Sequence, residues 1–490
     1  MTTQLTKPGT TDSNAVTTTA SKGILTIADA AAALRDGTIT SMAITTDIVE
    51  KAISLNEALG TYVTITQDLA LEQAAQADAA FAAGEDRGPL QGIPLAIKDI
   101  IAMKGAGTTA NSRVLDPEWG AGTDAPVVAR LRAAGSVFVG KSTTSEFAFG
   151  MPDPTKGFPV PHNPWDVERT PAGSSSGTGI AVAAGLALGG LGTDTGGSVR
   201  GPACVNGHTG LKVTFGRVPK SGVVPLGFSL DSVGPMARSA YDCALLLEVM
   251  AGYDASDPNA ADVPVPKYSE FLDGDVDGIR IGLPMPYFFD HEALDPDVRD
   301  AVLAGVGKLV GMGATAEEMA LPYAAEAKEA NHLILVAEAY AYHRNNLVNR
   351  WSDYGDLTRP NLARGAFYTA GDVAQANRFR SMWAGEVAKA FQKYDVLITP
   401  SAPNPAQLVK DMDPSHRLVQ PMYTGHWNLT GLPAVAIPSG FTAGGLPLSM
   451  QIIGKPFAEA TVLKVADAYQ RATSWHLMVP PVEALYDTAR

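Results

Sequence analysis

The chain is predicted to adopt an α/β fold, because segments typical of strands alternate with segments typical of helices along its 490 residues. Helical periodicity extends over residues 26–59, 67–83, 295–312, 323–350 and 371–393. Short apolar and β-branched runs, which are typical of strands, lie between the helical segments and are bounded by glycine or proline. An apolar content of 46% and a charged content of 18% are typical of a globular enzyme with a sizeable core.

The N-terminal part begins with a segment that is unlike the rest. Residues 1–22 are rich in Thr and Ser and contain no apolar run, so we expect a disordered tail rather than a secretory signal. The remainder, residues 23–490, is expected to form one domain. After the helices at 26–59 and 67–83, "GIPLAIKDI" predicts a strand, "APVVARLRAAG" an amphipathic helix that stops at Gly135, and "SVFVG" a strand.

The middle and C-terminal parts continue the alternation. Residues 150–173 carry six prolines and are expected to form a long loop, and the tract 179–192 a buried helix followed by a buried strand. "DSVGPMARSAYDCALLLEVMAG" predicts a helix after a loop, and residues 255–277 a surface loop. "GIRIGLP", "YDVLITP" and "PAVAIPSG" predict strands, and residues 457–473 a late helix.

Charge and cysteine content restrict the expected partners and location. A net charge of −14 disfavours a polyanion binder, so no nucleic acid is expected as a partner. Cys204 and Cys243 are too few for a disulfide framework or a zinc set, which favours a reducing, cytoplasmic location. The longest apolar tract, 179–192, is short for a membrane span and rich in glycine, so no membrane association is expected.

Two short motifs suggest functions that their surroundings do not support. Gly135 and the run Gly140-Lys141-Ser142 match the phosphate-binding loop of ATPases, but the four residues between them are predicted to be a strand, and a strand cannot wrap a phosphate. "GSSSG", centred on Ser175, matches the nucleophile elbow of α/β-hydrolases. The proline-containing "NPWDVERTPA" before it is not a buried strand, so this match is weak as well.

Three other features lie close together in the sequence and could share one site. Lys98 lies in an apolar strand, where it could be salt-bridged to Asp99 or be a desolvated general base. "PAGSSSGTGIAVAAG" is a serine-rich turn, which could equally be a capped helix start. "LGTDTGGSVRGPA" could expose backbone N–H groups beside a serine, as an oxyanion hole requires, or be a plain turn.

Together these stretches resemble the amidase signature family of serine hydrolases. The resemblance is dense between residues 88 and 240 and resumes at "YDVLITPSAP" and "WNLTGLPAVAIPSGF". It implies a single amidase-signature domain with a large central mixed β-sheet covered on both faces by helices. It also implies that residues 88–240 form the catalytic core and that about 255–425, where the resemblance is weakest, form a variable region that shapes the substrate pocket.

The resemblance implies a Ser–cisSer–Lys triad and no cofactor or metal. By matching position, Ser198 is the nucleophile, Ser174 the bridging serine after a cis peptide bond, and Lys98 the base. The remaining implied residues are the oxyanion-hole donors Thr195, Gly196, Gly197 and Ser198, the supporting residues Ser175, Asp194 and Arg200, and the acyl-pocket residues Phe149, Gly150 and Met151. Since the base must be neutral, we expect an alkaline optimum. The run Ala172–Gly177 departs from the family's Gly-Gly-Ser-Ser-Gly-Gly without removing a catalytic group.

The expected function is a stand-alone amidase that acts on a small, apolar or aryl amide, with carbamates, urethanes or esters as further possibilities. The aromatic content of the variable region is the basis of this expectation, together with the sequence after "VVPLGFSLDSVGP". A monomer or homodimer is expected. The alternatives are the A subunit of a tRNA-dependent amidotransferase and a non-catalytic binding protein on an amidase scaffold.

Overall fold

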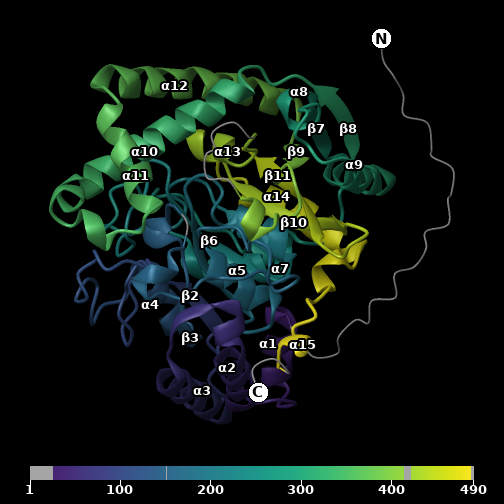
Figure 1. Ribbon diagram of the computed structural model, residues 1–490. Helices are drawn as coiled ribbons and strands as arrows, with labels where there is room; N and C mark the ends of the chain where they lie inside the picture. The colour runs from purple at the N-terminus through teal and green to yellow at the C-terminus, as the bar shows by residue number, and fades with distance from the viewer. Residues whose placement is uncertain (1–25, 151, 413–420, 487–490) are drawn as a thin grey trace.

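One mixed β-sheet organises the chain and brings distant segments together (Figure 1). The computed structural model describes residues 26–150, 152–412 and 421–486, so the predicted tail at 1–22 lies outside the described residues. Within these ranges the sheet has eleven strands, which in spatial order are β1 (Tyr62–Ile65), β3 (Val137–Ser142), β2 (Pro94–Lys98), β4 (Gly189–Asp194), β6 (Ser232–Ala237), β5 (Thr209–Lys212), β10 (Ala434–Phe441), β11 (Pro447–Gly454), β9 (Val396–Pro400), β7 (Arg280–Pro284) and β8 (Thr315–Met319).

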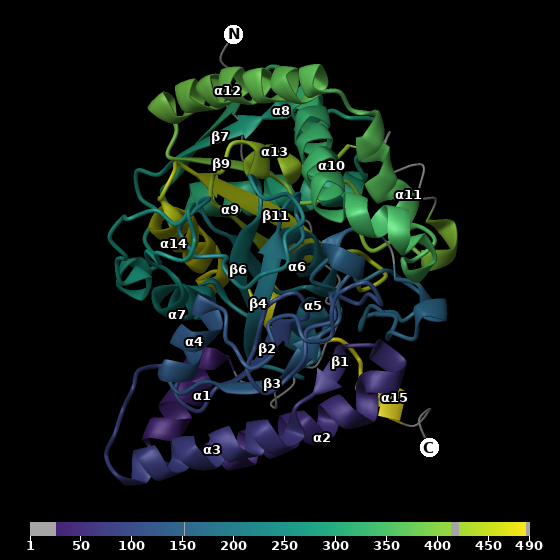
Figure 2. The same cartoon turned by 90° about the vertical axis from the view of Figure 1, so that its left-hand side faces the viewer.

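Helices cover both faces of this sheet, which confirms the predicted α/β architecture. Helices α5 and α6 pack on one face, whereas α7, α9 and α14 pack on the other (Figure 2). The described helices are α1 (Ile27–Arg35), α2 (Ser41–Leu59), α3 (Gln67–Ala82), α4 (Pro126–Ala133), α5 (Ser176–Ala183), α6 (Arg200–Asn206), α7 (Ala240–Met250), α8 (Met285–Phe288), α9 (Pro296–Gly311), α10 (Ala324–Asn349), α11 (Thr358–Ala363), α12 (Ala370–Lys393), α13 (Gly425–Leu429), α14 (Glu459–Arg471) and α15 (Glu483–Tyr486). None of them is long and apolar enough to cross a membrane.

Two segments show detail that the sequence-based expectations lacked. The helical periodicity at residues 26–59 belongs to two helices, because Gly37 adopts a φ of +74° after α1 and Thr40 caps the start of α2 by accepting a hydrogen bond from Ala43 N. The segment before α7, expected to be a loop, contains β6 at the centre of the sheet. Gly234 and Pro235 hid this strand, since both residues are unusual inside strands.

The sheet places the ends of two parallel strands side by side. Strand β2 is parallel to β4, with Ile97 opposite Leu191, so the strand ends at Lys98 and Asp194 lie at the same edge. Ligands of sheets with parallel strands commonly bind beyond such carboxyl ends. The loops that follow β4 and precede α5 converge on this edge and form the candidate site.

Candidate active site

Lys98 is the buried centre of a small cluster of hydroxyl groups. Its side chain is fully buried, and its Nζ lies 2.7 Å from Ser174 Oγ and 2.8 Å from Thr193 Oγ1. Burial lowers the pKa of Lys98 to about 7, although the negative charges of Asp194 and Asp231 act in the opposite direction. A substantial fraction of this lysine is therefore neutral near pH 7 and can accept a proton from a hydroxyl group.

The serine-rich turn before α5 connects this lysine to the turn after β4. The peptide bond between Gly173 and Ser174 is cis, as the family resemblance implied. The backbone N–H of Ser175 donates to the carbonyl oxygen of Ser198 at 3.2 Å, and Ser175 Oγ accepts from Thr193 N at 3.2 Å. These bonds hold the Ser174 and Ser198 segments against each other, and Ser198 stays half-buried and accessible from outside.

The turn from Thr195 to Ser198 presents backbone N–H groups beside Ser198. Among the residues that the structure describes, none accepts a hydrogen bond from the amides of Gly196 or Ser198. Gly197, which was expected among the oxyanion donors, instead donates its N–H to Asp194 Oδ1 at 2.8 Å. Gly197 therefore shapes the turn, with a φ of +131°, and its amide is not available to an oxyanion.

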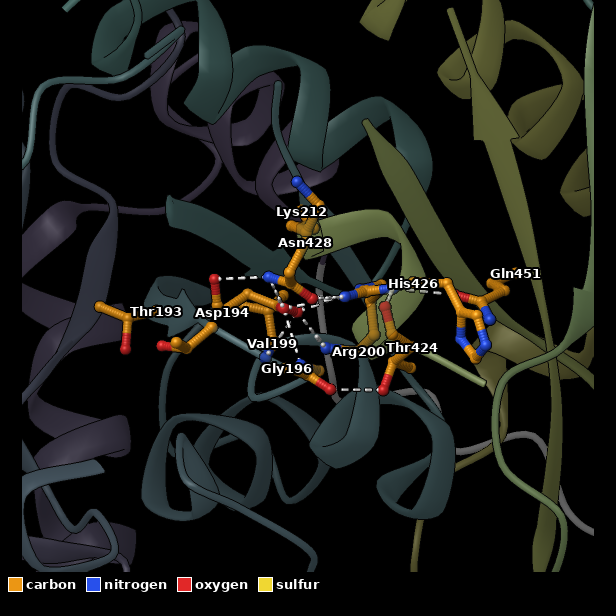
Figure 3. Close-up of polar contacts among 12 residues, drawn as sticks. Thr193, Asp194, Gly196, Val199, Arg200, Lys212, Thr424, His426, Asn428 and Gln451 are labelled. Atoms are coloured by element: carbon orange, nitrogen blue, oxygen red, sulfur yellow. Dashed lines mark hydrogen bonds and ion pairs between the residues drawn. The ribbon is translucent and has the colours of Figure 1, made fainter. Parts of the chain in front are cut away.

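Asp194 and Arg200 form a buried ion pair under this turn (Figure 3). Arg200 Nη2 lies 2.8 Å from Asp194 Oδ1 and also donates to Asn428 Oδ1, while its Nη1 donates to Thr424 O and Gln451 Oε1. Burial alone would raise the pKa of Asp194, but the charge and hydrogen bonds of Arg200 outweigh it and lower the pKa to about 2. The pair therefore stays ionised, and its hydrogen bonds fix the position of the turn that carries Ser198.

Breaking this ion pair should destabilise the protein strongly. We expect Arg200→Met to lower the free energy of unfolding by about 3–5 kcal/mol, because it leaves the Asp194 carboxylate buried without its charged partner. Urea denaturation measures the change. Arg280→Met, which removes a half-exposed arginine paired with Asp395, is the control and should leave the free energy of unfolding nearly unchanged. Equal stability losses in the two variants would contradict this assignment.

A second buried lysine explains the motif that resembles a phosphate loop. Lys141 lies on β3, and its Nζ donates to Thr108 Oγ1 at 2.6 Å and Ile101 O at 2.7 Å, with Asp99 Oδ1 at 3.3 Å. It is therefore the ion-pair partner of Asp99 and holds the chain that follows β2. Lys98 does not pair with Asp99, so the salt-bridged alternative for Lys98 is wrong.

The structure describes two of the three residues that were expected to line the acyl pocket. Phe149 and Gly150 are half-buried, and Gly150 lies against the first residue of α11, since an added Cβ there would be 2.6 Å from Thr358 Oγ1. Met151 lies outside the described residues. A cavity of about 200 Å³ has Thr193 and Asp231 in its wall, and Asp231 accepts a hydrogen bond from Thr195 Oγ1 at 2.5 Å. In the described ranges, no three His, Cys, Asp or Glu side chains are grouped to hold a metal ion.

Several residues of this centre were missed by sequence reasoning. Thr193, which accepts from Lys98, lies inside the quoted stretch "LGTDTGGSVRGPA" and could have been noticed there. Thr424, Asn428 and Gln451 come from distant segments and carry no local signal. They reach Arg200 only because β10 and β11 bring the C-terminal part of the chain to the middle of the sheet.

Comparison with known proteins gives consistent matches over nearly the whole chain. A family model described as Amidase matches residues 43–463. The chain is 39% identical to the A subunit of glutamyl-tRNA(Gln) amidotransferase from Roseiflexus sp. (strain RS-1), over 94% of this chain and 99% of that protein. Similar solved structures include the corresponding amidotransferase subunit from Thermotoga maritima (TM-score 0.79, 29% identity, 93% and 97% covered) and native peptide amidase from Stenotrophomonas maltophilia (0.81, 28%, 91% and 96%).

These similarities correct the expected function and partners. Relatives at 38–39% identity over nearly full length are named as a subunit of an enzyme that acts on a tRNA, so the expected stand-alone amidase is wrong. The expected lack of nucleic-acid and protein partners, with a monomer or homodimer, is wrong for the same reason. The names of the relatives give no support to a carbamate, urethane or ester substrate. Net charge misled the prediction because it sums the whole surface and does not describe a local patch or a partner chain.

Proposed function

The chain belongs to the Amidase family, and from this premise we propose that it is the A subunit of a glutamyl-tRNA(Gln) amidotransferase. In this role it would hydrolyse the side-chain carboxamide of glutamine and release ammonia for transfer to the glutamyl-tRNA. The observation that supports this proposal is the 39% identity that extends over 99% of the relative from Roseiflexus. Nearly the whole length of that relative therefore has a counterpart in this chain.

The proposed chemistry uses Lys98 as a neutral base and Ser198 as the nucleophile. Lys98 Nζ takes the proton of Ser174, and Ser174 Oγ takes the proton of Ser198 as Ser198 Oγ attacks the carboxamide carbon. The 2.7 Å separation of Lys98 Nζ and Ser174 Oγ supports the first of these transfers. The carbonyl oxygen becomes an oxyanion that accepts hydrogen bonds from the amides of Gly196 and Ser198.

The second half of the reaction returns the proton and frees the enzyme. The C–N bond breaks, and the leaving nitrogen takes a proton that travels from Lys98 through Ser174, so ammonia leaves and an acyl-Ser198 ester remains. Water then attacks this ester, with Lys98 again as the base, and the acid product departs. The net change is one amide and one water converted to one carboxylic acid and one ammonia.

The pH dependence of kcat/KM should follow the ionisation of Lys98. With a pKa of Lys98 at about 7, the neutral base becomes rarer as pH falls, so kcat/KM should drop about tenfold per pH unit below 7 and level off above it. Initial rates of ammonia release between pH 5 and 9.5 measure this profile, with circular dichroism at each pH as the control for folding. A maximum near pH 5 would exclude Lys98 as the neutral base.

An isotope experiment tests the proposed function. The tagged full-length chain would be purified with its bound proteins from its own organism and supplied with glutamine labelled with ¹⁵N in the side-chain amide, ATP and glutamyl-tRNA(Gln). We expect ¹⁵N in the carboxamide of the resulting glutaminyl-tRNA, and its loss when the same assembly carries Ser198→Ala. Ammonia release from amides by the lone chain, without any transfer to the tRNA by the purified material, would overturn the proposal.

A further inference from the structure

Asn331 is a buried amide that lacks a hydrogen-bond partner on its nitrogen. It lies on α10 and is only 2% exposed, yet its Nδ2 donates to no residue that the structure describes. Nearly all buried polar groups in proteins are hydrogen-bonded, and leaving one unpaired destabilises the fold. A partner supplied by a bound ligand would account for such a donor.

The position of Asn331 indicates that the ligand that would accept this hydrogen bond is the substrate. Its Oδ1 lies beside Gly196, where an added Cβ would meet it at 3.4 Å, and beside Gly425, where the separation would be 2.8 Å. Gly196 is two residues before Ser198 and is itself half-buried. The two next-nearest atoms to the same point are apolar, namely Leu335 Cδ1 and Met422 Sδ. A buried polar group with apolar neighbours next to the nucleophile is typical of a residue that orients a substrate.

We propose that Asn331 is a substrate-binding residue whose Nδ2 donates a hydrogen bond to a carboxylate or carbonyl on the acyl part of the amide substrate. The inference rests on the proposed reaction at Ser198 and adds to it the substrate group that is recognised. Glutamine carries such a group in its α-carboxylate. Asn331 also lies within residues 255–425, the region that the sequence predicts to shape the pocket.

A pair of buried asparagines separates a binding role from a structural one. Asn428 is 1% exposed and fully engaged, since its Oδ1 accepts from Arg200 and its Nδ2 donates to Asp194. In thermal unfolding, Asn331→Leu should keep or raise the melting temperature because it removes an unpaired amide, whereas Asn428→Leu should lower it by several degrees. A similar loss in both variants would mean that Asn331 is structural and would overturn the proposal. This comparison needs no substrate.

A pair of amides tests the recognition directly. Glutaramate and pentanamide have the same chain length and differ in a terminal carboxylate against a methyl group. For Asn331→Leu we expect the KM for glutaramate to rise at least tenfold with little change in kcat, and kcat/KM for pentanamide to stay within threefold of the wild-type value. Equal losses on both amides would overturn the inference. Failure of the tRNA experiment alone would overturn the amidotransferase assignment and leave this result standing.

Discussion

Ser198→Ala should lower amide hydrolysis by a factor of about 10⁵ or more while the protein stays folded. The size of the loss follows from removal of the atom that forms the covalent bond, which in serine hydrolases costs as much as removal of the whole catalytic set. Rates of ammonia release at pH 8–9 measure the effect. Intact mass spectrometry should detect an acyl adduct on the wild-type chain during turnover, and peptide mapping should place it on Ser198.

A serine far from the site provides the control for this substitution. Ser54 is exposed on α2 and donates only to the carbonyl of Lys51, so Ser54→Ala should keep wild-type activity and stability. If Ser198→Ala retains more than a tenth of the wild-type rate, Ser198 is not the nucleophile. An adduct on Ser174 or Ser175 would reassign that role within the same turn.

Lys98→Met should abolish most activity with little loss of stability. General-base removal costs a factor of about 10²–10⁴ in rate. Within the described ranges, Lys98 makes no ion pair, and burial lowers its pKa to about 7, so removal of its charge offsets much of the cost of the two hydrogen bonds lost at Ser174 and Thr193. We therefore expect the free energy of unfolding, measured by urea denaturation, to fall by no more than about 1–2 kcal/mol.

Lys141 is the matched control, because it is equally buried on the neighbouring strand but paired with Asp99. Lys141→Met should lower the free energy of unfolding by about 3–5 kcal/mol, since Asp99 is then buried without its partner. If Lys98→Met destabilises the protein as much as Lys141→Met, the positive charge of Lys98 serves the fold rather than the reaction.

The sequence was most informative where local pattern and chemistry coincide. The apolar run around Lys98 predicts a strand, and its lysine is indeed buried at the end of β2. The glycine-rich turns at Ser174 and Ser198 are also local features, and the structure brings both to one edge of the sheet. These are cases in which residue type, spacing and element all favour the same placement.

The rest of the site depends on long-range pairing that local patterns do not encode. Thr424 and Gln451 have ordinary polar side chains, and only the order of strands in the sheet explains their contact with Arg200. At Gly197 the local pattern misled the prediction. A glycine at this position fits an oxyanion-binding turn, but its backbone N–H donates to Asp194 instead. The tRNA of the proposed function was harder still to predict, since a net charge summed over the whole chain does not locate a docking surface.

The reach of Arg200 across the chain has a consequence for protein synthesis. Arg200 emerges from the ribosome long before Thr424, Asn428 and Gln451, which supply three of its acceptors. A nascent chain that ends before these residues can pair Arg200 with Asp194 but lacks the three later acceptors, so the turn that carries Ser198 has only part of its support. The turn that carries Ser198 can therefore reach the hydrogen-bonded arrangement of the folded protein only when translation is almost complete.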